Sequence, residues 1–175
     1  MATEIHTSTL RLLAPTLRAG DLIYLSGTVY TARDAAHKRI FSLIDEGKEL
    51  PFEIKDSLIY YAGPTPARSG MVIGSCGPTT ASRMDPFAPK LLDMGLLAMI
   101  GKGERSEEVR RAVIRNSALY LCAVGGAGAL SSKCITSCEV IAFDDLGCES
   151  IKRLTFSRFP LYVGIDTEGN SIFKR

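Results

Sequence analysis

The sequence has no tryptophan, only two histidines and no long apolar run. Its longest nearly uncharged stretch, residues 117–132, is shorter than the ~20 apolar residues that a membrane-spanning helix needs. The polar segment of residues 1–5 precedes no signal-like apolar run, so we expect a cytoplasmic protein that binds no membrane. His6 lies in a terminal segment that we expect to be disordered, which leaves His37 as the histidine available for chemistry.

A strong charge of either sign is also absent. The 21 basic and 19 acidic residues give a net charge of +2, which is too small to indicate nucleic acid or an acidic membrane as a partner. The tyrosines and phenylalanines are scattered rather than interleaved with basic clusters, which also argues against nucleic-acid binding. The chain has no internal repeat, low-complexity tract or convincing linker, and we expect residues 1–175 to form a single domain.

Paired cysteine motifs are missing as well. The five cysteines are an odd number and include no CxxC pair, which predicts reduced thiols. Cys134 and Cys138 are spaced to share one face of a helix, but no neighbouring histidine completes a set of metal ligands. We therefore favour buried thiols over a cluster held by these cysteines, and we expect no metal site in this chain alone.

Short apolar runs separated by polar, glycine-containing loops predict an α/β domain with a mixed sheet. Strands are expected at residues 21–29, 57–62, 71–74, 96–100 and 118–124. One helix follows the first strand as far as Glu46, with Thr31 as its N-cap, and another begins after the N-cap Ser106. Residues 139–173 have the composition of strands, with a hairpin turn at residues 166–170.

Three loops set a cation or hydroxyls beside small residues at a strand end, where open α/β sheets bind their ligands. In the first, Arg33 lies at the positive end of a helix, which fits an anion bound between them; an exposed arginine paired with Asp34 is the alternative. In the second, residues 77–83, hydroxyl groups precede Arg83, which can hold a carboxylate through two parallel hydrogen bonds. In the third, Lys102 stands between two glycines.

Two arginines and a lysine at three strand ends favour a dicarboxylate over a neutral ligand. The second loop lacks the glycine and lysine spacing of a nucleotide-binding P-loop. A general base is less evident, since His37 is expected to lie about one turn into a helix.

The same loops belong to a longer series of motifs. In order, the motifs are GDLIYLSGTVYTARDAAHKR (residues 20–39), IYYAGP (59–64), IGSCGPTTASRMD (73–85), IGKG (100–103), VGGAGAL (124–130) and FPLYVGIDTEGN (159–170). Together they resemble the C-terminal domain, or separate β subunit, of the iron–sulfur hydro-lyases, the family of class I fumarases and L(+)-tartrate dehydratases. The resemblance covers nearly the whole chain, and GPTT followed by R-M-D is its most specific part.

This resemblance implies a fold, a partner and a reaction. The fold is a single swivelling β/β/α domain that closes over a larger domain or subunit. That partner, the cluster-bearing α subunit, holds a 4Fe–4S cluster on three cysteines, in a hetero-oligomer such as α2β2. The reaction is the reversible addition of water to fumarate, which gives malate.

The resemblance also implies roles for residues of the three loops. Substrate carboxylates are expected to contact Arg33, Arg83 and Lys102. Thr79 is expected to supply a catalytic hydroxyl, which positive surroundings must activate. The residues expected to support them are Asp34, His37 and Thr80. One departure is Ala81-Ser82, where many fumarases have a glycine before the arginine.

Two other interpretations remain open. The β subunit of an L(+)-tartrate dehydratase is the first, although the Arg-Met-Asp sequence at residues 83–85 favours fumarase. A non-catalytic module that binds small anions is the second, since the same three loops would serve it.

Overall fold

The computed structural model describes residues 2–173 and confirms an α/β domain with a mixed sheet. Within that range the sheet has seven strands in the order β1-β2-β3-β4-β5-β7-β6. The strands are β1 (Thr3–His6), β2 (Leu22–Thr31), β3 (Leu58–Tyr60), β4 (Ala98–Gly101), β5 (Leu119–Cys122), β6 (Ile135–Ala142) and β7 (Ile151–Ile165). Strands β1 to β5 are parallel, whereas β7 is antiparallel to its neighbours β2, β5 and β6.

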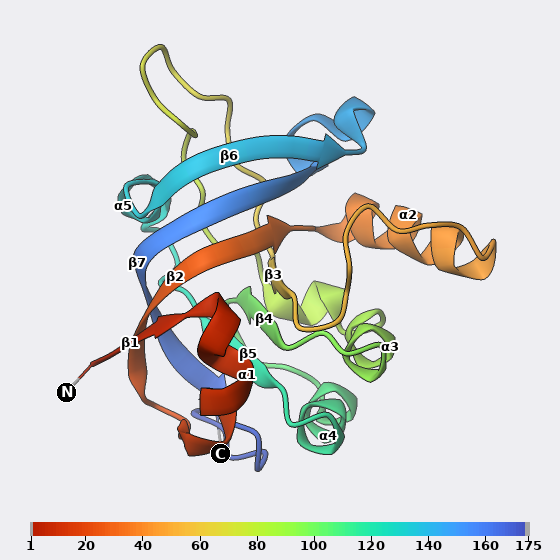
Figure 1. Cartoon of the computed structure of the whole chain (residues 1–175), viewed down its shortest axis with the longest axis vertical. Helices are drawn as coiled ribbons and strands as arrows, with labels where there is room; N and C mark the ends of the chain where they lie inside the picture. Colours follow the sequence, from red (N-terminus) through yellow and green to blue (C-terminus); the bar gives the residue numbers. More distant parts are fainter. Residues whose placement is uncertain (1, 174–175) are drawn as a thin grey trace.

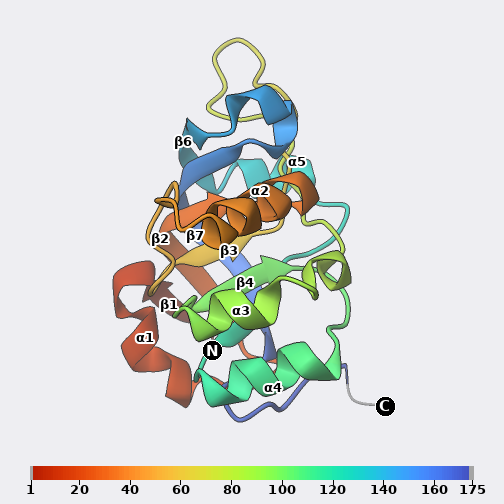
Figure 2. The ribbon, with the colours of Figure 1, turned by 90° about the vertical axis from the view of Figure 1, so that its right-hand side faces the viewer.

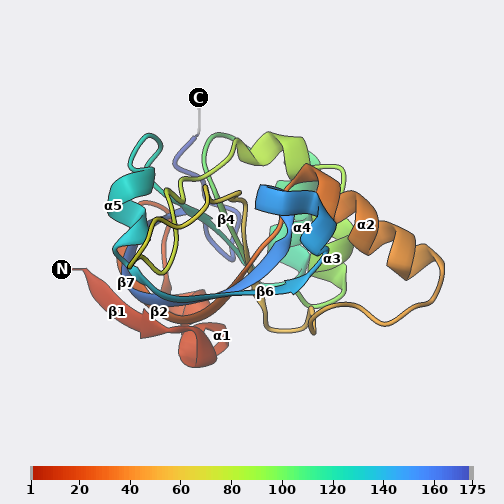
Figure 3. The ribbon, with the colours of Figure 1, turned by 90° about the horizontal axis from the view of Figure 1, so that it is seen from above.

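The long strand β7 closes the sheet on itself. It pairs with β2 along most of its length, with β6 over its first part and with β5 near its end. Strands β2, β3, β4, β5 and β7 therefore form a closed ring, seen from above in Figure 3. Alternate side chains of these strands, such as Leu25, Tyr60, Ile100, Leu121 and Phe156, form one apolar core. This shared core fixes the strand ends relative to one another.

Helices α2, α3 and α4 pack against the ring on the side opposite α5 (Figures 1 and 3). The helices are α1 (Leu10–Leu13), α2 (Asp34–Asp45), α3 (Ala88–Asp93), α4 (Glu107–Arg115) and α5 (Gly128–Ser132), with the 3₁₀ helices η1 (Thr7–Thr9), η2 (Ala14–Thr16), η3 (Ala81–Met84) and η4 (Asp144–Glu149). Figure 2 shows α2, α3 and α4 side by side, and their buried side chains form a second core with Ile59, Tyr61 and Met99. No helix in residues 2–173 is long and apolar enough to cross a membrane.

Most of the predicted elements are present. The strands expected at residues 21–29, 57–62, 96–100 and 118–124 correspond to β2, β3, β4 and β5. Helix α4 follows its predicted N-cap, because the Ser106 hydroxyl accepts a hydrogen bond from the Val109 amide at 3.3 Å. Its first turn carries Glu107 and Glu108, which the positive end of the helix dipole favours.

The predicted N-cap Thr31 is wrong. Thr31 is the last residue of β2, and its hydroxyl donates to the Ser150 carbonyl and accepts from the Lys152 amide. Helix α2 has Arg33 as its N-cap residue instead. The strand continues further than local sequence indicates because Tyr30 and Thr31 pair with β3.

Two further local predictions are wrong for the same kind of reason. Residues 71–74, expected to be a strand, lie in the loop between β3 and η3 that projects at the top of Figure 1, and Met71 and Val72 are exposed. The N-terminal segment, expected to be disordered, forms β1 and pairs in parallel with β2. Strand composition alone did not identify which segments find a neighbouring strand.

The C-terminal third also differs in detail from the prediction. Strand β6 begins at Ile135, so Cys138 lies in a strand and shares no helical face with Cys134. Both cysteines pack against the core of the ring. The apolar core, rather than a helix, therefore explains their positions.

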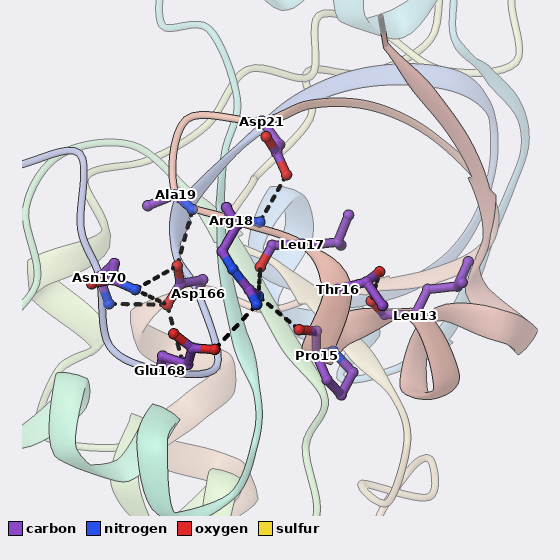
Figure 4. Close-up of polar contacts among 10 residues, drawn as sticks. All are labelled: Leu13, Pro15, Thr16, Leu17, Arg18, Ala19, Asp21, Asp166, Glu168 and Asn170. Atoms are coloured by element: carbon purple, nitrogen blue, oxygen red, sulfur yellow. Dashed lines mark hydrogen bonds and ion pairs between the residues drawn. The ribbon is translucent and has the colours of Figure 1, made fainter.

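The predicted turn at residues 166–170 is confirmed and is organised by one buried carboxylate, shown in Figure 4. Asp166 accepts hydrogen bonds from the amides of Ala19, Glu168 and Asn170 at 3.0–3.1 Å. Burial alone would raise the pKa of Asp166, but these hydrogen bonds outweigh it and hold the pKa below its ordinary value. The turn is thereby tied to the segment that leads into β2.

Candidate functional site

The three cation-bearing loops all lie at one edge of the ring. Because β2, β3, β4 and β5 are parallel, their carboxyl ends meet at the same edge. The loops after these strands carry Arg33, Thr79, Arg83 and Lys102, and the loop after β5 carries Gly125. Direct contacts between neighbouring loops join them into one site.

Arg33 follows β2 and lies against the loop after β3. A methyl group on Gly63 would lie 2.8 Å from Arg33 Nη1 and 3.1 Å from its Cδ, so the absence of a side chain at Gly63 makes room for the arginine. The Arg33 Nε atom is buried and has no hydrogen-bond partner within residues 2–173. A buried donor without a partner is costly, so this atom is a candidate for contact with a bound anion.

Arg83 joins the first loop to the second. Its Nε and Nη2 atoms lie 3.1 and 2.9 Å from the two carboxylate oxygens of Asp34, a two-point ion pair. The Arg83 side chain is half exposed, so it retains a face toward solvent or a ligand. Asp34 therefore pairs with an arginine, as the alternative interpretation of the sequence expected, but that arginine is Arg83 rather than Arg33.

The positive end of α2 is met by a carboxylate that sequence analysis missed. Glu149, at the end of η4, accepts a hydrogen bond from the Ala35 amide at 3.2 Å. The adjoining turn is held by the Lys152 ammonium group, which donates to the Ser150 hydroxyl at 2.7 Å and to the carbonyls of Gly147 and Cys148. More than 100 residues separate Glu149 from Ala35, and no local sequence signal predicts the contact.

Thr79, Thr80 and Lys102 come together between β3 and β4. The Thr79 amide donates to the Tyr61 carbonyl at 2.7 Å, and Thr80 forms an isolated parallel bridge with Lys102. The Ala81 amide donates to the Lys102 carbonyl at 2.9 Å. The GPTT loop is thus hydrogen-bonded on one side to the residue that follows β3 and on the other to the residue that follows β4.

The Lys102 side chain extends toward the glycine-rich loop after β5. A methyl group on Gly125 would lie 3.3 Å from Lys102 Cδ and 3.8 Å from its Nζ. Within residues 2–173, Arg83 has a carboxylate partner, whereas Lys102 and Arg33 form no ion pair. The predicted site residues are therefore gathered at one edge of the ring with two cations free to bind an anion.

His37 is buried and contacts the backbone of the Arg33 loop. Its ring is fully buried, packs against Tyr61 and Phe87, and donates from Nδ1 to the Arg33 carbonyl at 2.8 Å. Burial lowers the pKa of His37 from 6.5 to about 4, so the ring is neutral at neutral pH. A neutral, enclosed imidazole holds the Arg33 backbone and is poorly placed to exchange protons with a ligand.

The last residue of the R-M-D sequence has a structural role. Asp85 Oδ1 lies 2.6 Å from Nε of the fully buried Arg105 side chain, and Asp85 Oδ2 accepts from the Ser106 amide at 2.7 Å. Both oxygens of Asp85 are thus occupied at the start of α4. No local sequence pattern pointed to Arg105, because its partner Asp85 lies 20 residues away in another element.

The cysteines do not form a metal site together. Residues 2–173 contain no group of three or more His, Cys, Asp or Glu side chains able to hold a metal ion. The five thiols are unpaired and distributed between the core and the surface, and burial raises the pKa of Cys76 to about 12 and of Cys122 to about 11. These side chains do not fit an iron–sulfur cluster.

The fold and site together define a small α/β domain whose loops gather arginine, lysine and threonine side chains at the carboxyl edge of a closed ring. Sequence comparison identifies the particular family. Residues 3–175 match the family described as "Fumarase C-terminus", and the chain belongs to that family. The resemblance predicted from the motifs is confirmed.

Individual relatives fall into two groups. The anaerobic class I fumarate hydratase of Escherichia coli K12 is 41% identical over 153 residues, which cover 86% of this chain and 28% of the relative. A putative L(+)-tartrate dehydratase subunit beta of Methanocaldococcus jannaschii is 35% identical over 164 residues, which cover 90% of this chain and 84% of the relative. The L(+)-tartrate dehydratase subunit beta of Escherichia coli K12 is 32% identical, with 89% and 79% covered.

The chain thus spans only 28% of the length of the fumarate hydratase but most of each β subunit. In length it corresponds to a whole β subunit or to one part of a longer enzyme.

Proposed function

We propose that this chain is the β subunit of a two-subunit hydro-lyase that adds water to fumarate or removes it from tartrate. Its role is to bind the substrate carboxylates and to supply a catalytic hydroxyl. The observation that carries this proposal is that Arg33 and Lys102 form no ion pair within the described residues 2–173, where the buried Arg33 Nε atom also lacks a hydrogen-bond partner. A dicarboxylate would satisfy both cations at once.

In this proposal the three cations bind the carboxylate groups of the substrate. Arg33 extends from the end of β2 and Lys102 from the end of β4, on either side of β3, and both bind carboxylate oxygens, while Arg83 shares its guanidinium between Asp34 and the substrate. Positive charge at these positions stabilises the negative charge that develops when the carbon next to a carboxylate loses its proton.

Thr79 transfers that proton in the proposed mechanism. Its amide is bound to the Tyr61 carbonyl, and its neighbour Thr80 bridges Lys102. Positive charge nearby favours the deprotonated form of a hydroxyl, which a threonine needs in order to act as a base. His37 does not compete for this role because its ring is buried and neutral.

The remaining chemistry belongs to a partner. We propose that a cluster-bearing α subunit supplies a 4Fe–4S cluster as Lewis acid, since the cysteines of this chain do not fit one. Exposed apolar side chains flank the cationic loops in sequence and are suited to contact with such a partner: Met71, Val72, Val124 and Leu130. We further propose that residues 1–175 act as one swivelling domain in the cytoplasm, within a hetero-oligomer such as α2β2.

Both fumarate and tartrate remain candidate substrates in this proposal. The identity of 41% favours fumarate, and the match to most of a tartrate dehydratase β subunit favours tartrate. Asp85 gives no reason to prefer fumarate, because Arg105 and Ser106 occupy both of its oxygens. Steady-state assays of the complex formed with the partner subunit from the same source, with each substrate, distinguish the two.

The proposed catalytic role of this chain is tested by the variant Thr79→Ala in the complex with the partner subunit. Because general acid–base groups typically contribute ~100-fold or more, we expect kcat to fall at least about 100-fold with the fold intact. Thr136→Ala, which removes a hydroxyl from the exposed strand β6, serves as the control and should leave kcat unchanged. A kcat for Thr79→Ala within about tenfold of the unmodified enzyme would rule out proton transfer by Thr79.

A further inference from the structure

The Arg105 side chain is fully buried between elements that carry two of the three cationic loops, those of Arg83 and Lys102. It follows β4 and the Lys102 loop, immediately before the N-cap of α4. A buried guanidinium is costly unless its donors are satisfied, and Arg105 has partners on several sides. Its contacts with Asp85, Tyr61 and Tyr120 lead to different parts of the candidate site.

The first connection leads to the loop of Arg83. Asp85 lies two residues after Arg83 and pairs with Arg105 at 2.6 Å. The second oxygen of the same carboxylate accepts from the Ser106 amide at 2.7 Å. The end of η3 is therefore fixed to the start of α4 through one carboxylate.

The second connection leads to Thr79. The Arg105 guanidinium lies 5.3 Å from the centre of the Tyr61 ring, and its Nη2 lies 3.4 Å from the Tyr61 hydroxyl. The carbonyl of the same tyrosine accepts the Thr79 amide at 2.7 Å. The Tyr61 ring also contacts Gly101, since a methyl group there would lie 2.9 Å from Tyr61 Cδ2. A shift of this tyrosine would move both the GPTT loop and the start of the Lys102 loop.

The third connection leads to the Lys102 loop from its other side. The Arg105 guanidinium lies 4.9 Å from the centre of the Tyr120 ring, and the Tyr120 hydroxyl donates to the Gly103 carbonyl at 2.8 Å. Lys102 is thus held between Gly101, which contacts Tyr61, and Gly103, which is bound to Tyr120.

We propose that Arg105 is a positioning residue that holds Thr79, Arg83 and Lys102 in their productive arrangement. This inference rests on the proposed function for its kinetic consequence, but its structural consequence can be measured without it. Arg105 cannot touch the substrate, because its side chain is fully buried, so it acts through Asp85, Tyr61 and Tyr120.

The test uses Arg105→Lys, which keeps the charge beside Asp85 but loses the planar group that reaches both tyrosines. Arg115→Lys is the matched control, because Arg115 forms an exposed two-point pair with Asp93 at the far end of α4. Hydrogen exchange of single backbone amides is followed by NMR for the isolated chain. We expect the Thr79 and Ala81 amides to exchange at least about tenfold faster in Arg105→Lys, while amides in β7 are unaffected.

The kinetic arm uses the complex with the partner subunit. Misplacement of reacting groups by about 1 Å costs on the order of 100-fold, so we expect kcat to fall about 10- to 100-fold in Arg105→Lys and to stay unchanged in Arg115→Lys. Unchanged exchange at Thr79 and Ala81 would overturn the inference, as would a loss of global stability with kcat of the folded enzyme unaltered. If the unmodified complex lacks hydro-lyase activity, the proposed function fails, and the exchange measurement still decides the role of Arg105.

Discussion

At the scale of single residues, the three cations of the site differ in what surrounds them. Arg83 is paired with Asp34, whereas the buried Nε atom of Arg33 has no partner among residues 2–173 and Lys102 extends over Gly125. The motifs predicted these residues as a group, because each cation stands beside small residues at a strand end. They did not predict how the cations are supported, since Gly63, Glu149 and Arg105 each contact a residue that is distant in sequence.

Replacing either arginine by lysine keeps the charge but removes the planar two-point contact with a carboxylate. A hydrogen bond to a charged group contributes about 1.5–3 kcal/mol, so we expect KM for the dicarboxylate to rise by about tenfold or more in Arg33→Lys and in Arg83→Lys. Arg153→Lys, on the exposed face of β7 beside Glu139, is the control. Steady-state kinetics of the complex provide the measurement, and unchanged KM in both variants would place these arginines outside the pocket.

The buried His37 predicts a dependence of stability on pH. Its pKa in the folded chain is about 4, below the ordinary 6.5, so the unfolded chain binds the proton more readily. Stability is therefore fully present above pH 6.5 and is lost as the pH falls toward about 4. At pH 5 the loss from this one group is about 2 kcal/mol.

Urea unfolding at about pH 7.5 and about pH 5 measures this loss. In His37→Gln, which keeps a donor but cannot be protonated, we expect the difference between the two pH values to be smaller by about 2 kcal/mol. An equal difference in both proteins would show that His37 is protonated as easily in the folded chain as in the unfolded one.

At the scale of elements, the apolar runs of β2, β3, β4 and β5 could be predicted because each strand is buried and continuous. The same criterion fails for β1, which is short and polar and is a strand only because it pairs with β2. It also wrongly predicts a strand at residues 71–74, which have an apolar pattern but pair with no strand within residues 2–173. Pairing depends on contacts between distant segments, so a pattern within one segment cannot settle it.

The hairpin turn after β7 provides a test at this scale (Figure 4). Asp166→Ala leaves the partly buried amides of Ala19 and Asn170 without their acceptor, and we expect the free energy of unfolding to fall by about 3 kcal/mol. Asp21→Ala is the matched control, because Asp21 is exposed and accepts one hydrogen bond from the Arg18 amide. We expect that variant to lose about 1 kcal/mol or less, as measured by urea denaturation. Equal losses would mean that the Asp166 network adds nothing.

At the scale of the whole molecule, the ring brings four parallel strand ends to one edge and fixes the cationic loops there. The molecule gathers two arginines and a lysine at this edge, and its thiols do not form a cluster site within residues 2–173. It spans 28% of a fumarate hydratase and 84% of a tartrate dehydratase β subunit. These observations agree with a chain that forms one part of an active site.

The central claim is that this chain supplies the carboxylate-binding half of a hydro-lyase site and needs a cluster-bearing partner for turnover. The most direct measurement is iron and sulfide analysis of the isolated chain under anaerobic conditions, beside assays of fumarate hydration and tartrate dehydration before and after mixing with the partner subunit. We predict that the isolated chain is folded, colourless and inactive, and that mixing restores activity in a stable complex. A stoichiometric cluster in the isolated chain, or substantial activity without the partner, would show that turnover does not depend on a cluster-bearing partner.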